Sequence, residues 1–427
     1  MRSRSMAYEV TSRSAARVAA SSRVRLVPGM RRILPPGPGS PEREMHRHDE
    51  PVSEPGRTRE VAVLFLRLGT IAFGGPVAHT AMMREELVRR RGWVTDERFV
   101  DLMGATNLIP GPNSTELAIH LGFDRARWRG LLLAGVCFIL PAALIVTALA
   151  WAYVEYGDTP SAEWLLYGVV PAVLAIVAWA LVALLRTVVK TVWLGLLALA
   201  GLAAYFLGVH ELVVLFGGAA VAGLARVASR AGGSRHGLLA PLAVLFPDPT
   251  GGQLAQLFLT MLKIGAVLYR SGYVLLAFLQ GDLVDRLGWV TQQQLLDAVS
   301  IGQVTPGPVF TTATFLGYLV AGLPGAFLAT VGIFLPSFVF VGLLTRITDR
   351  LRSSPWTSTM LDGLNATALA LMAGVSWELG RAALVDGWTV GIFAVTLLLM
   401  WRTELNSAWY VAGGATAGIV LGLIGWN

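Results

Sequence analysis

Asn107-Leu108-Ile109-Pro110-Gly111-Pro112-Asn113-Ser114-Thr115-Glu116 is the stretch that constrains this chain most. It lies inside an apolar segment, 99–121, that is long enough to enter a bilayer. Pro-Gly-Pro cannot continue a helix, because proline lacks the backbone N–H and clashes with the preceding turn. A broken backbone is tolerated at membrane depth only where protein buries it or a wet cavity hydrates it. The stretch therefore predicts an interior site rather than a simple span.

The composition places the chain among integral membrane proteins. Of its 427 residues, 54% are hydrophobic and 14% charged, and the mean hydropathy is +0.60. Apolar stretches that can face a lipid bilayer occur at 61–83, 130–153, 165–185, 192–207, 212–224 and 325–344. The net charge of +7 comes largely from arginines in the N-terminal tail and short loops, which is the positive-inside pattern rather than a nucleic-acid surface. The single cysteine, Cys137, excludes an internal disulfide, and we expect neither a metal nor a cofactor.

Four regions follow from the pattern along the chain. Residues 1–58 are rich in Arg, Ser, Pro and Gly without an apolar period, which predicts a disordered basic tail. Residues 59–228 form a first membrane repeat, 229–252 a basic Gly-rich linker, and 253–427 a second membrane repeat.

The second repeat copies the first. Pro110 and Pro306 are 196 residues apart (306 − 110), and the second break reads Gln303-Val304-Thr305-Pro306-Gly307-Pro308-Val309-Phe310-Thr311-Thr312. The same offset relates the following pairs: Arg67 and Lys263, Gly69 and Gly265, Glu86 and Asp282, Asp101 and Asp297, and Asn107 and Gln303. An offset of 195 relates Gly130 to Gly325 and Pro141 to Pro336. Agreement of Gly, Pro and charge type over this length indicates duplication. Paired breaks at matching places are typical of a transporter's binding site.

The distribution of charge indicates that the halves are inverted. The basic loop 125–129 precedes the span 130–153, whose far end is acidic at Glu155 and Asp158. In the second half the matching span begins in the uncharged stretch 318–324 and ends in the basic stretch 346–352, so matching spans run in opposite directions. The predicted fold is an all-α polytopic membrane protein in which each Pro-Gly-Pro segment dips in and returns, giving about ten crossings. This count places the basic tail outside; a first segment that also failed to cross would place it inside.

Several residues near the breaks suit an anion. A helix that restarts after Pro-Gly-Pro presents free N–H groups and the positive end of its dipole, here following Pro110, Gly111 and Pro112 and following Pro306, Gly307 and Pro308. Side chains that can donate hydrogen bonds there are Ser114, Thr311, Thr312, Asn107 and Gln303. Arg67 and Lys263 either approach one shared dianion site or extend to an interface, and the polar groups either bind a ligand or satisfy the broken backbone.

Two further residues could couple transport to protons. Glu116 has Thr312 as its counterpart, and an intramembrane carboxylate either carries a proton or pairs with Arg67. His79 can titrate near neutral pH, although a lone histidine usually only forms hydrogen bonds. Gly74, Gly75 and Gly272 are predicted to permit close helix packing.

At these residues the chain resembles the chromate ion transporter family, in its long, two-domain form. The resemblance covers about 60–427 and rests on Phe73-Gly74-Gly75-Pro76 with His79, Trp93, the two Pro-Gly-Pro motifs, Ser271-Gly272-Tyr273 and Trp289. It departs from the family at Tyr269-Arg270, where glycine usually precedes Ser-Gly. The resemblance implies export of chromate, a tetrahedral dianion like sulfate, and chromate resistance.

The leading hypothesis is a secondary transporter of the inner membrane that exports chromate, with protons or another ion in exchange and a homodimer as one assembly to test. A transporter of sulfate or another tetrahedral oxyanion is the alternative in the same class. An intramembrane enzyme is the alternative of another class, but it needs a nucleophile with a base, or a metal cluster, and the spans offer neither pattern.

Overall fold

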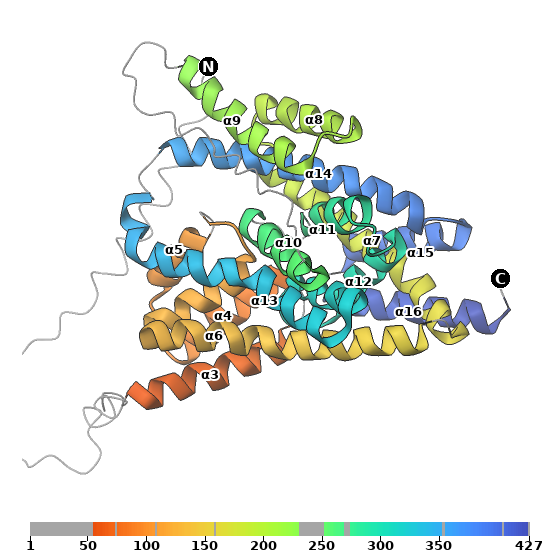
Figure 1. The fold of residues 1–427 in the computed structure, drawn as a ribbon, viewed down its shortest axis with the longest axis horizontal. Coiled ribbons are helices and arrows are strands. Elements are labelled where there is room, and N and C mark those ends of the chain that lie inside the picture. The colour runs from red at the N-terminus through yellow and green to blue at the C-terminus, as the bar shows by residue number, and fades with distance from the viewer. Residues whose placement is uncertain are drawn as a thin grey trace, which may run out of the picture. The chain divides into compact units, whose positions relative to one another are not determined.

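The computed structural model describes residues 54–72, 75–106, 109–157, 159–229, 252–268, 274–351, 355–403 and 405–425, and every element within these ranges is helical (Figure 1). The first half consists of α3 (Glu54–Ile71), α4 (Gly75–Arg84), the π-helical turn η2 (Glu85–Arg90), α5 (Asp96–Thr106), α6 (Asn113–Tyr156), α7 (Pro160–Val188), α8 (Val192–Phe206) and α9 (Glu211–Ser229). The second consists of α10 (Gln253–Val267), α11 (Leu275–Leu279), the π-helical turn η3 (Gln280–Arg286), α12 (Gln292–Val304), the 3-10 turn η4 (Val309–Thr311), α13 (Thr312–Leu351), α14 (Pro355–Ala383), α15 (Gly387–Arg402) and α16 (Ser407–Leu423). The two halves match element by element, as the repeat predicts.

The predicted tail and linker lie mostly outside the described residues. Residues 1–53 and 230–251 belong to neither described half. The tail was predicted to run to residue 58, but residues 54–58 already belong to α3.

The two longest helices are hairpins. In α6 the backbone leaves helical geometry at Ala126 (φ −141°, ψ 30°) and Arg127 (φ 52°, ψ −141°), and α13 does the same at Ala321 (φ −149°, ψ 29°) and Gly322 (φ 61°, ψ −147°). A Cβ on Gly122 would lie 2.3 Å from the carbonyl oxygen of Gly130, so the short arm before the kink folds back on the long arm after it. The two halves therefore share this sharp turn at repeat-equivalent positions, so the repeat seen in the sequence is also present in the backbone conformation.

The halves pack reciprocally and run in opposite directions. Helix α3 packs on α6 as α10 packs on α13, and α7 packs on α16 as α14 packs on α9, which is the contact pattern of a two-fold relationship. Between the long arms, Trp128 contacts the Gly342 position and Phe338 contacts the Gly135 position. Because the residue number rises in one arm as it falls in the other, these equivalent helices are antiparallel. The inverted repeat predicted from the charge distribution is therefore present.

Ion pairs show that the Pro-Gly-Pro segment returns to the side from which it starts. Arg98 at the start of α5 makes two hydrogen bonds, of 2.8 and 3.0 Å, to Asp124 at the end of the short arm of α6, 26 residues further on. A continuous helix would hold them about 39 Å apart. Arg125, next to Asp124, also bonds Glu60 near the start of α3 at 2.8 Å. We call this surface, with Arg84, Arg98, Arg125 and Lys190, the basic face.

The first segment returns as well. Glu60 of α3 lies on the basic face, and so does Arg84 at the end of α4, which bonds Asp96 at 2.8 Å through both Nε and Nη2. The segment 61–83 was predicted to cross, but helix α3 ends at Ile71 and α4 leads back, so it does not. This correction places the start of α3 on the basic face. The basic N-terminal tail then precedes a helix on that same face, in agreement with the positive-inside pattern.

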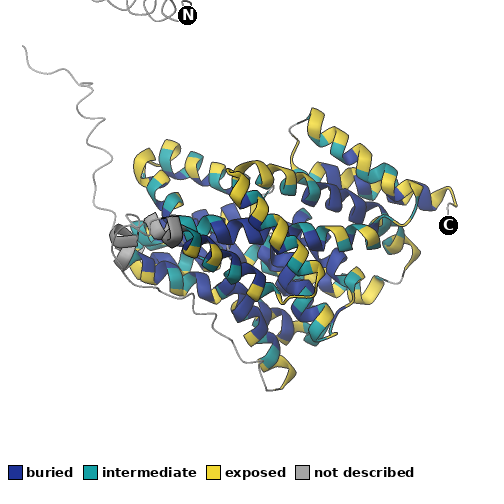
Figure 2. Ribbon diagram, turned by 90° about the horizontal axis from the view of Figure 1, so that it is seen from above, coloured by how far each residue is buried: buried dark blue, intermediate teal, exposed yellow. Residues whose placement is uncertain are grey.

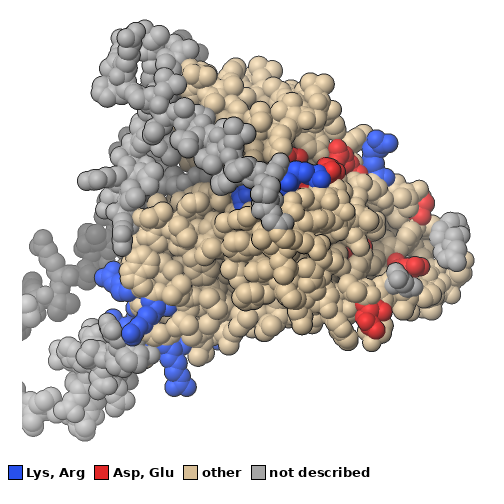
Figure 3. Space-filling model, viewed as in Figure 1, with Lys and Arg blue, Asp and Glu red and all other residues tan. Residues whose placement is uncertain are grey.

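The outer surfaces of the helices suit a bilayer. Within the described ranges, three helices are long and apolar enough to cross a membrane: Asn113–Tyr156, Pro160–Val188 and Val309–Thr345. Their outward positions, and those of α8 and α15, carry exposed apolar side chains such as Leu144, Leu199 and Leu398 (Figure 2). In Figure 3, Lys and Arg lie at the left edge, near the upper centre and at the upper right, whereas Asp and Glu lie mainly toward the right. The acidic side chains visible in this view are therefore concentrated toward one end.

Candidate functional site

The two Pro-Gly-Pro breaks lie at the interface between the halves. The Gly111 N–H donates to the Leu268 carbonyl at 2.7 Å, and the Gly307 N–H donates to the Ala72 carbonyl at 2.9 Å. Leu268 and Ala72 are themselves repeat-equivalent, each just past the first helix of its half. Each break thus satisfies a backbone group of the other half, and four interruptions of regular helix meet in one place.

Glycine is needed at the centre of each break. Gly111 has φ 137° and Gly307 has φ 92°, values that a side chain would strain. Pro112 and Pro308 then precede the helical turns that begin at Asn113 and Val309. The first N–H groups of a helix have no partner within it, so both breaks present donors and the positive dipole end.

His79 joins the first break to this junction. Its Nε2 lies 3.0 Å from the Ala72 carbonyl and its Nδ1 lies 3.2 Å from the Ser114 hydroxyl. Because a carbonyl only accepts, Nε2 carries the hydrogen and Nδ1 accepts from Ser114 in the neutral ring. The edge of the ring contacts Phe138, with centroids 5.5 Å apart. These contacts place His79 between Ala72 and the first break.

Glu116 is fully buried one turn into α6. A Cβ on Gly111 would lie 2.1 Å from one Glu116 carboxylate oxygen and 2.7 Å from the Ser337 hydroxyl, so these three groups are tightly packed. The Ser337 hydroxyl lies close to this carboxylate, and no Lys or Arg of the described ranges forms an ion pair with it. Arg67 is exposed on the outer side of α3, so the alternative of a Glu116–Arg67 pair is wrong.

The two repeat-equivalent cations do not share a site. Arg67 lies on the outward side of α3 with Val63 and Leu66. Lys263 is 8% exposed, and its Nζ contacts Asp282 at 2.6 Å. Asp282 also contacts Arg286 at 3.0 Å. The shared dianion site predicted from their symmetry is therefore not formed, because one cation faces outward and the other is neutralised.

Most other predicted donors support the backbone. The Thr311 hydroxyl donates to the Pro308 carbonyl and the Thr312 hydroxyl to the Val309 carbonyl, both at 2.8 Å. Gln303 is buried, and its Nε2 has no hydrogen-bond partner in the part of the chain that is described. Gly75 does not pack closely as predicted: it has φ 75° at the start of α4, and a Cβ there would meet nothing within 4 Å. Asn107, Gly74 and Gly272 lie outside the described residues.

A cavity of about 740 Å³ leads from the basic face to the first break. The exposed Arg84 and Lys190 lie on its wall, each beside an acid: Arg84 beside Asp96, and Lys190 3.5 Å from Asp362. The hydrogen bonds from Arg84 lower the pKa of the Asp96 carboxyl. Deeper polar groups on the wall are Thr106 at the end of α5, Asn113 at the start of α6 and Asn365 of α14. The cavity therefore connects an aqueous surface to a helix N-terminus at the centre.

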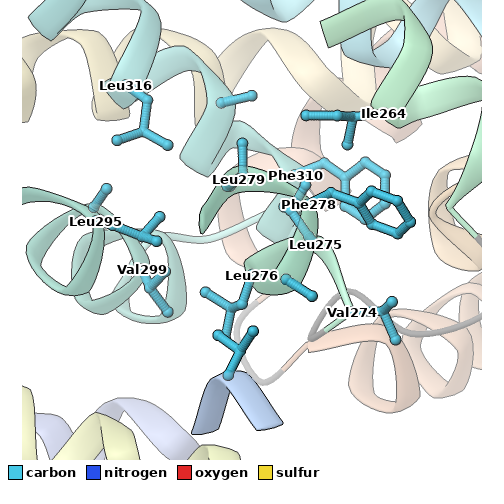
Figure 4. Close-up of a cluster of buried hydrophobic side chains, with 14 of the residues drawn as sticks. Ile264, Val274, Leu275, Leu276, Phe278, Leu279, Leu295, Val299, Phe310 and Leu316 are labelled. Carbon is cyan, nitrogen blue, oxygen red and sulfur yellow. The ribbon is translucent and has the colours of Figure 1, made fainter. Parts of the chain in front are cut away.

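The matching position in the second half is filled. The residues 196 positions beyond Phe99, Val100 and Met103, which line the cavity, are Leu295, Leu296 and Val299. These three are buried in the largest apolar cluster, with Leu276 and Phe310 (Figure 4). Repeat-equivalent residues therefore line an open cavity in the first half and are packed together in the second half.

Reasoning from sequence missed several residues of this region. Asn365, Thr106, Ser337 and the buried His120 were assigned no role. Asn365 lies within the apolar helix α14, and a polar side chain inside a membrane helix is the signal that could have found it.

Comparison with known proteins settles the family. The family model described as Chromate transporter matches residues 59–224 and again residues 255–419, once in each half. The chain belongs to the chromate transporter family. The fold of its two described halves is therefore that of a membrane transporter.

Relatives of the chain align over most of their length. The chromate transport protein of Cupriavidus metallidurans is 34% identical over 373 residues, which are 85% of this chain and 92% of the relative. The probable chromate transport protein of Synechococcus elongatus is 32% identical over 85% of this chain and 95% of its own length. The chromate transport protein of Pseudomonas aeruginosa is 32% identical over 86% of this chain and 94% of its own length. No solved structure matches the chain.

Proposed function

We propose that the chain exports chromate across the inner membrane as a secondary transporter and so confers chromate resistance. The cavity carries this proposal, because it opens on the basic face and ends at the first break. The positive-inside rule makes the basic face cytoplasmic. A cytoplasmic oxyanion therefore has an open path to the centre, while the packed counterpart closes the other side. An oxyanion can therefore enter from the cytoplasm in this state, as export requires.

Backbone groups at the break are the proposed anion ligands. The N–H groups that follow Pro110, Gly111 and Pro112 point from the start of α6, where an anion gains from the helix dipole and from hydrogen bonds together. When the second side opens, the turn after Pro306, Gly307 and Pro308 supplies the equivalent donors. The ion is passed between two related half-sites in this scheme.

Protons are the proposed coupling ion, with Glu116 as the carrier. Burying an unpaired carboxylate charge is costly, and a proton on Glu116 removes that cost. His120 and Asp124 follow at intervals of four residues, so the three lie along one side of the short arm, from the break to the basic face. This row supports proton exchange with the cytoplasmic side.

Transport of labelled chromate in vesicles of both orientations tests the direction. In everted membrane vesicles, whose outer surface is the former cytoplasmic face, the chain should accumulate chromate when a proton gradient is imposed. Vesicles without the chain serve as control. Accumulation only in right-side-out vesicles would show import and contradict the proposal.

Sulfate transport is the second candidate. The cavity presents amides and hydroxyls that recognise tetrahedral oxygen atoms and do not distinguish the central atom. Sulfate is the main substrate if unlabelled sulfate inhibits chromate uptake at equal concentration and labelled sulfate is accumulated faster than chromate. Chromate would then be transported because it resembles sulfate in shape and charge.

A further inference from the structure

Asn113 and Asn365 are the two amides on the cavity wall, and Asn365 is the one that the second half contributes. It is only 9% exposed, lies on α14 of the second half, and lines a cavity that ends at the break of the first half. Its amide atoms are not among the fully buried polar atoms that lack a partner, so the side chain reaches the space of the cavity. An amide in that position can donate hydrogen bonds to a ligand inside the cavity.

The threonines of the wall are poor candidates for the same task. The hydroxyl of Thr80 donates to the Pro76 carbonyl at 2.8 Å, that of Thr106 to the Met103 carbonyl at 2.9 Å, and that of Thr187 to the Leu184 carbonyl at 3.0 Å. Each hydroxyl has one hydrogen to donate, and each is used within its own helix. An amide has two N–H donors, so Asn365 can hold a ligand that these hydroxyls cannot.

The charged groups of the wall are also engaged. Arg84 is held by Asp96 through two bonds, and Lys190 lies beside Asp362. Both pairs are solvent-exposed, where an ion pair contributes little to binding or stability. A ligand that reaches the inner end of the cavity therefore meets neutral donors and the N-terminus of α6 rather than an unpaired cation.

We propose that Asn365 is a direct ligand of the transported tetrahedral oxyanion, which it binds by neutral hydrogen bonds at the inner end of the cavity. This inference rests on the proposed function and specifies its site. Both halves then contribute to the cytoplasm-facing site: the first half provides the N-terminus of α6, and the second half provides Asn365 on α14. Neutral donors bind a dianion firmly enough to select it, yet without the Coulomb attraction that would trap it.

The repeat supplies a natural test residue. The counterpart of Asn365 is Val170 (365 − 195), which is buried at the same place in α7. Asn365→Val therefore introduces a side chain that this fold already accommodates and removes both N–H donors. Asn365→Asp keeps the shape and replaces the donors with a negative charge. Thr187→Val is the matched control, because it changes the same wall but removes a hydroxyl that is already used within α7.

Equilibrium binding of labelled sulfate and of labelled chromate to the purified full chain measures the effect without requiring transport. Asn365→Val should weaken binding of both anions by about 10-fold or more, as expected for loss of hydrogen bonds to a charged ligand. Asn365→Asp should weaken it further, and Thr187→Val should stay within about twofold of the unmodified chain.

Binding within twofold for both Asn365 variants would overturn the inference, as would failure of the unmodified chain to bind either anion. Thermal unfolding in the same detergent separates a merely structural role: lower stability with unchanged affinity also overturns it. If anions bind as expected but are not transported, the inference stands and the proposed function fails.

Discussion

Glu116 is a fully buried acid at the first break, and one substitution can separate its role in coupling from a role in folding. Glu116→Gln keeps the size and polarity of the side chain but cannot exchange a proton. Chromate uptake driven by a pH gradient should fall to the level of vesicles without the chain, whereas exchange of labelled for unlabelled chromate should persist. Unchanged dependence on the gradient would remove Glu116 from coupling. Loss of the protein from the membrane would instead assign it a structural role beside Gly111 and Ser337.

The backbone of Arg127 adopts a conformation that suits glycine, and this leads to a prediction about stability. Its φ is 52° with ψ −141°, and its counterpart in the second half is Gly322. Such strain costs about 1–3 kcal/mol, while the Arg127 guanidinium over the Phe123 ring returns about 0.5–1 kcal/mol. Arg127→Gly should therefore leave stability unchanged or raise it, and Gly322→Ala should lower it by about 1–3 kcal/mol. Unfolding in detergent measures both, and a neutral Gly322→Ala would contradict the strain argument.

At the scale of elements, the contact between α10 and η3 distinguishes the two repeat-equivalent cations. Removing one partner of a buried ion pair costs about 3–5 kcal/mol, and the remaining Arg286 contact reduces this for Asp282. Lys263→Met should thus destabilise the chain by about 2–4 kcal/mol, and Lys263→Met with Asp282→Leu should recover part of that loss. Arg67→Gln, on the exposed side of α3, should stay within about 0.5 kcal/mol. Equal effects of the two single changes would restore the symmetric role predicted from sequence.

Sequence alone predicted the elements that carry strong local signals. The two Pro-Gly-Pro breaks, the duplication and the opposite directions of the halves follow from proline chemistry, spacing and the positions of arginines. The outward orientation of Arg67 on α3 was not predicted. Valine and leucine occupy exposed positions of this helix, such as Val63 and Leu66, as well as its buried positions, so apolar residues alone do not mark the buried side. The return of α3 through α4 was only an alternative at the level of sequence, since it depends on pairs such as Glu60 with Arg125 that are far apart in sequence. Asn365 was missed because its importance comes from a cavity formed by helices of both halves.

At the scale of the whole molecule, the two-fold relationship and the unequal cavities together describe one state of a transporter. The first break is open to the basic face, and the equivalent position of the second half is packed with leucine and valine. Exchanging the conformations of the two halves would close the first side and open the second, which is how inverted repeats provide alternating access. The central claim is therefore that the cavity beside α5 is the path of the substrate from the cytoplasm.

Labelling of two repeat-equivalent cysteines tests this claim most directly. In a Cys137→Ala background, Met103→Cys lies on the cavity wall and Val299→Cys lies in the packed cluster. A membrane-impermeant thiol reagent added to everted vesicles should label Met103→Cys, and sulfate should slow that labelling. Val299→Cys should stay unlabelled under the same conditions. Labelling of Val299→Cys from the cytoplasmic side, or of Met103→Cys only from the opposite side, would contradict the account.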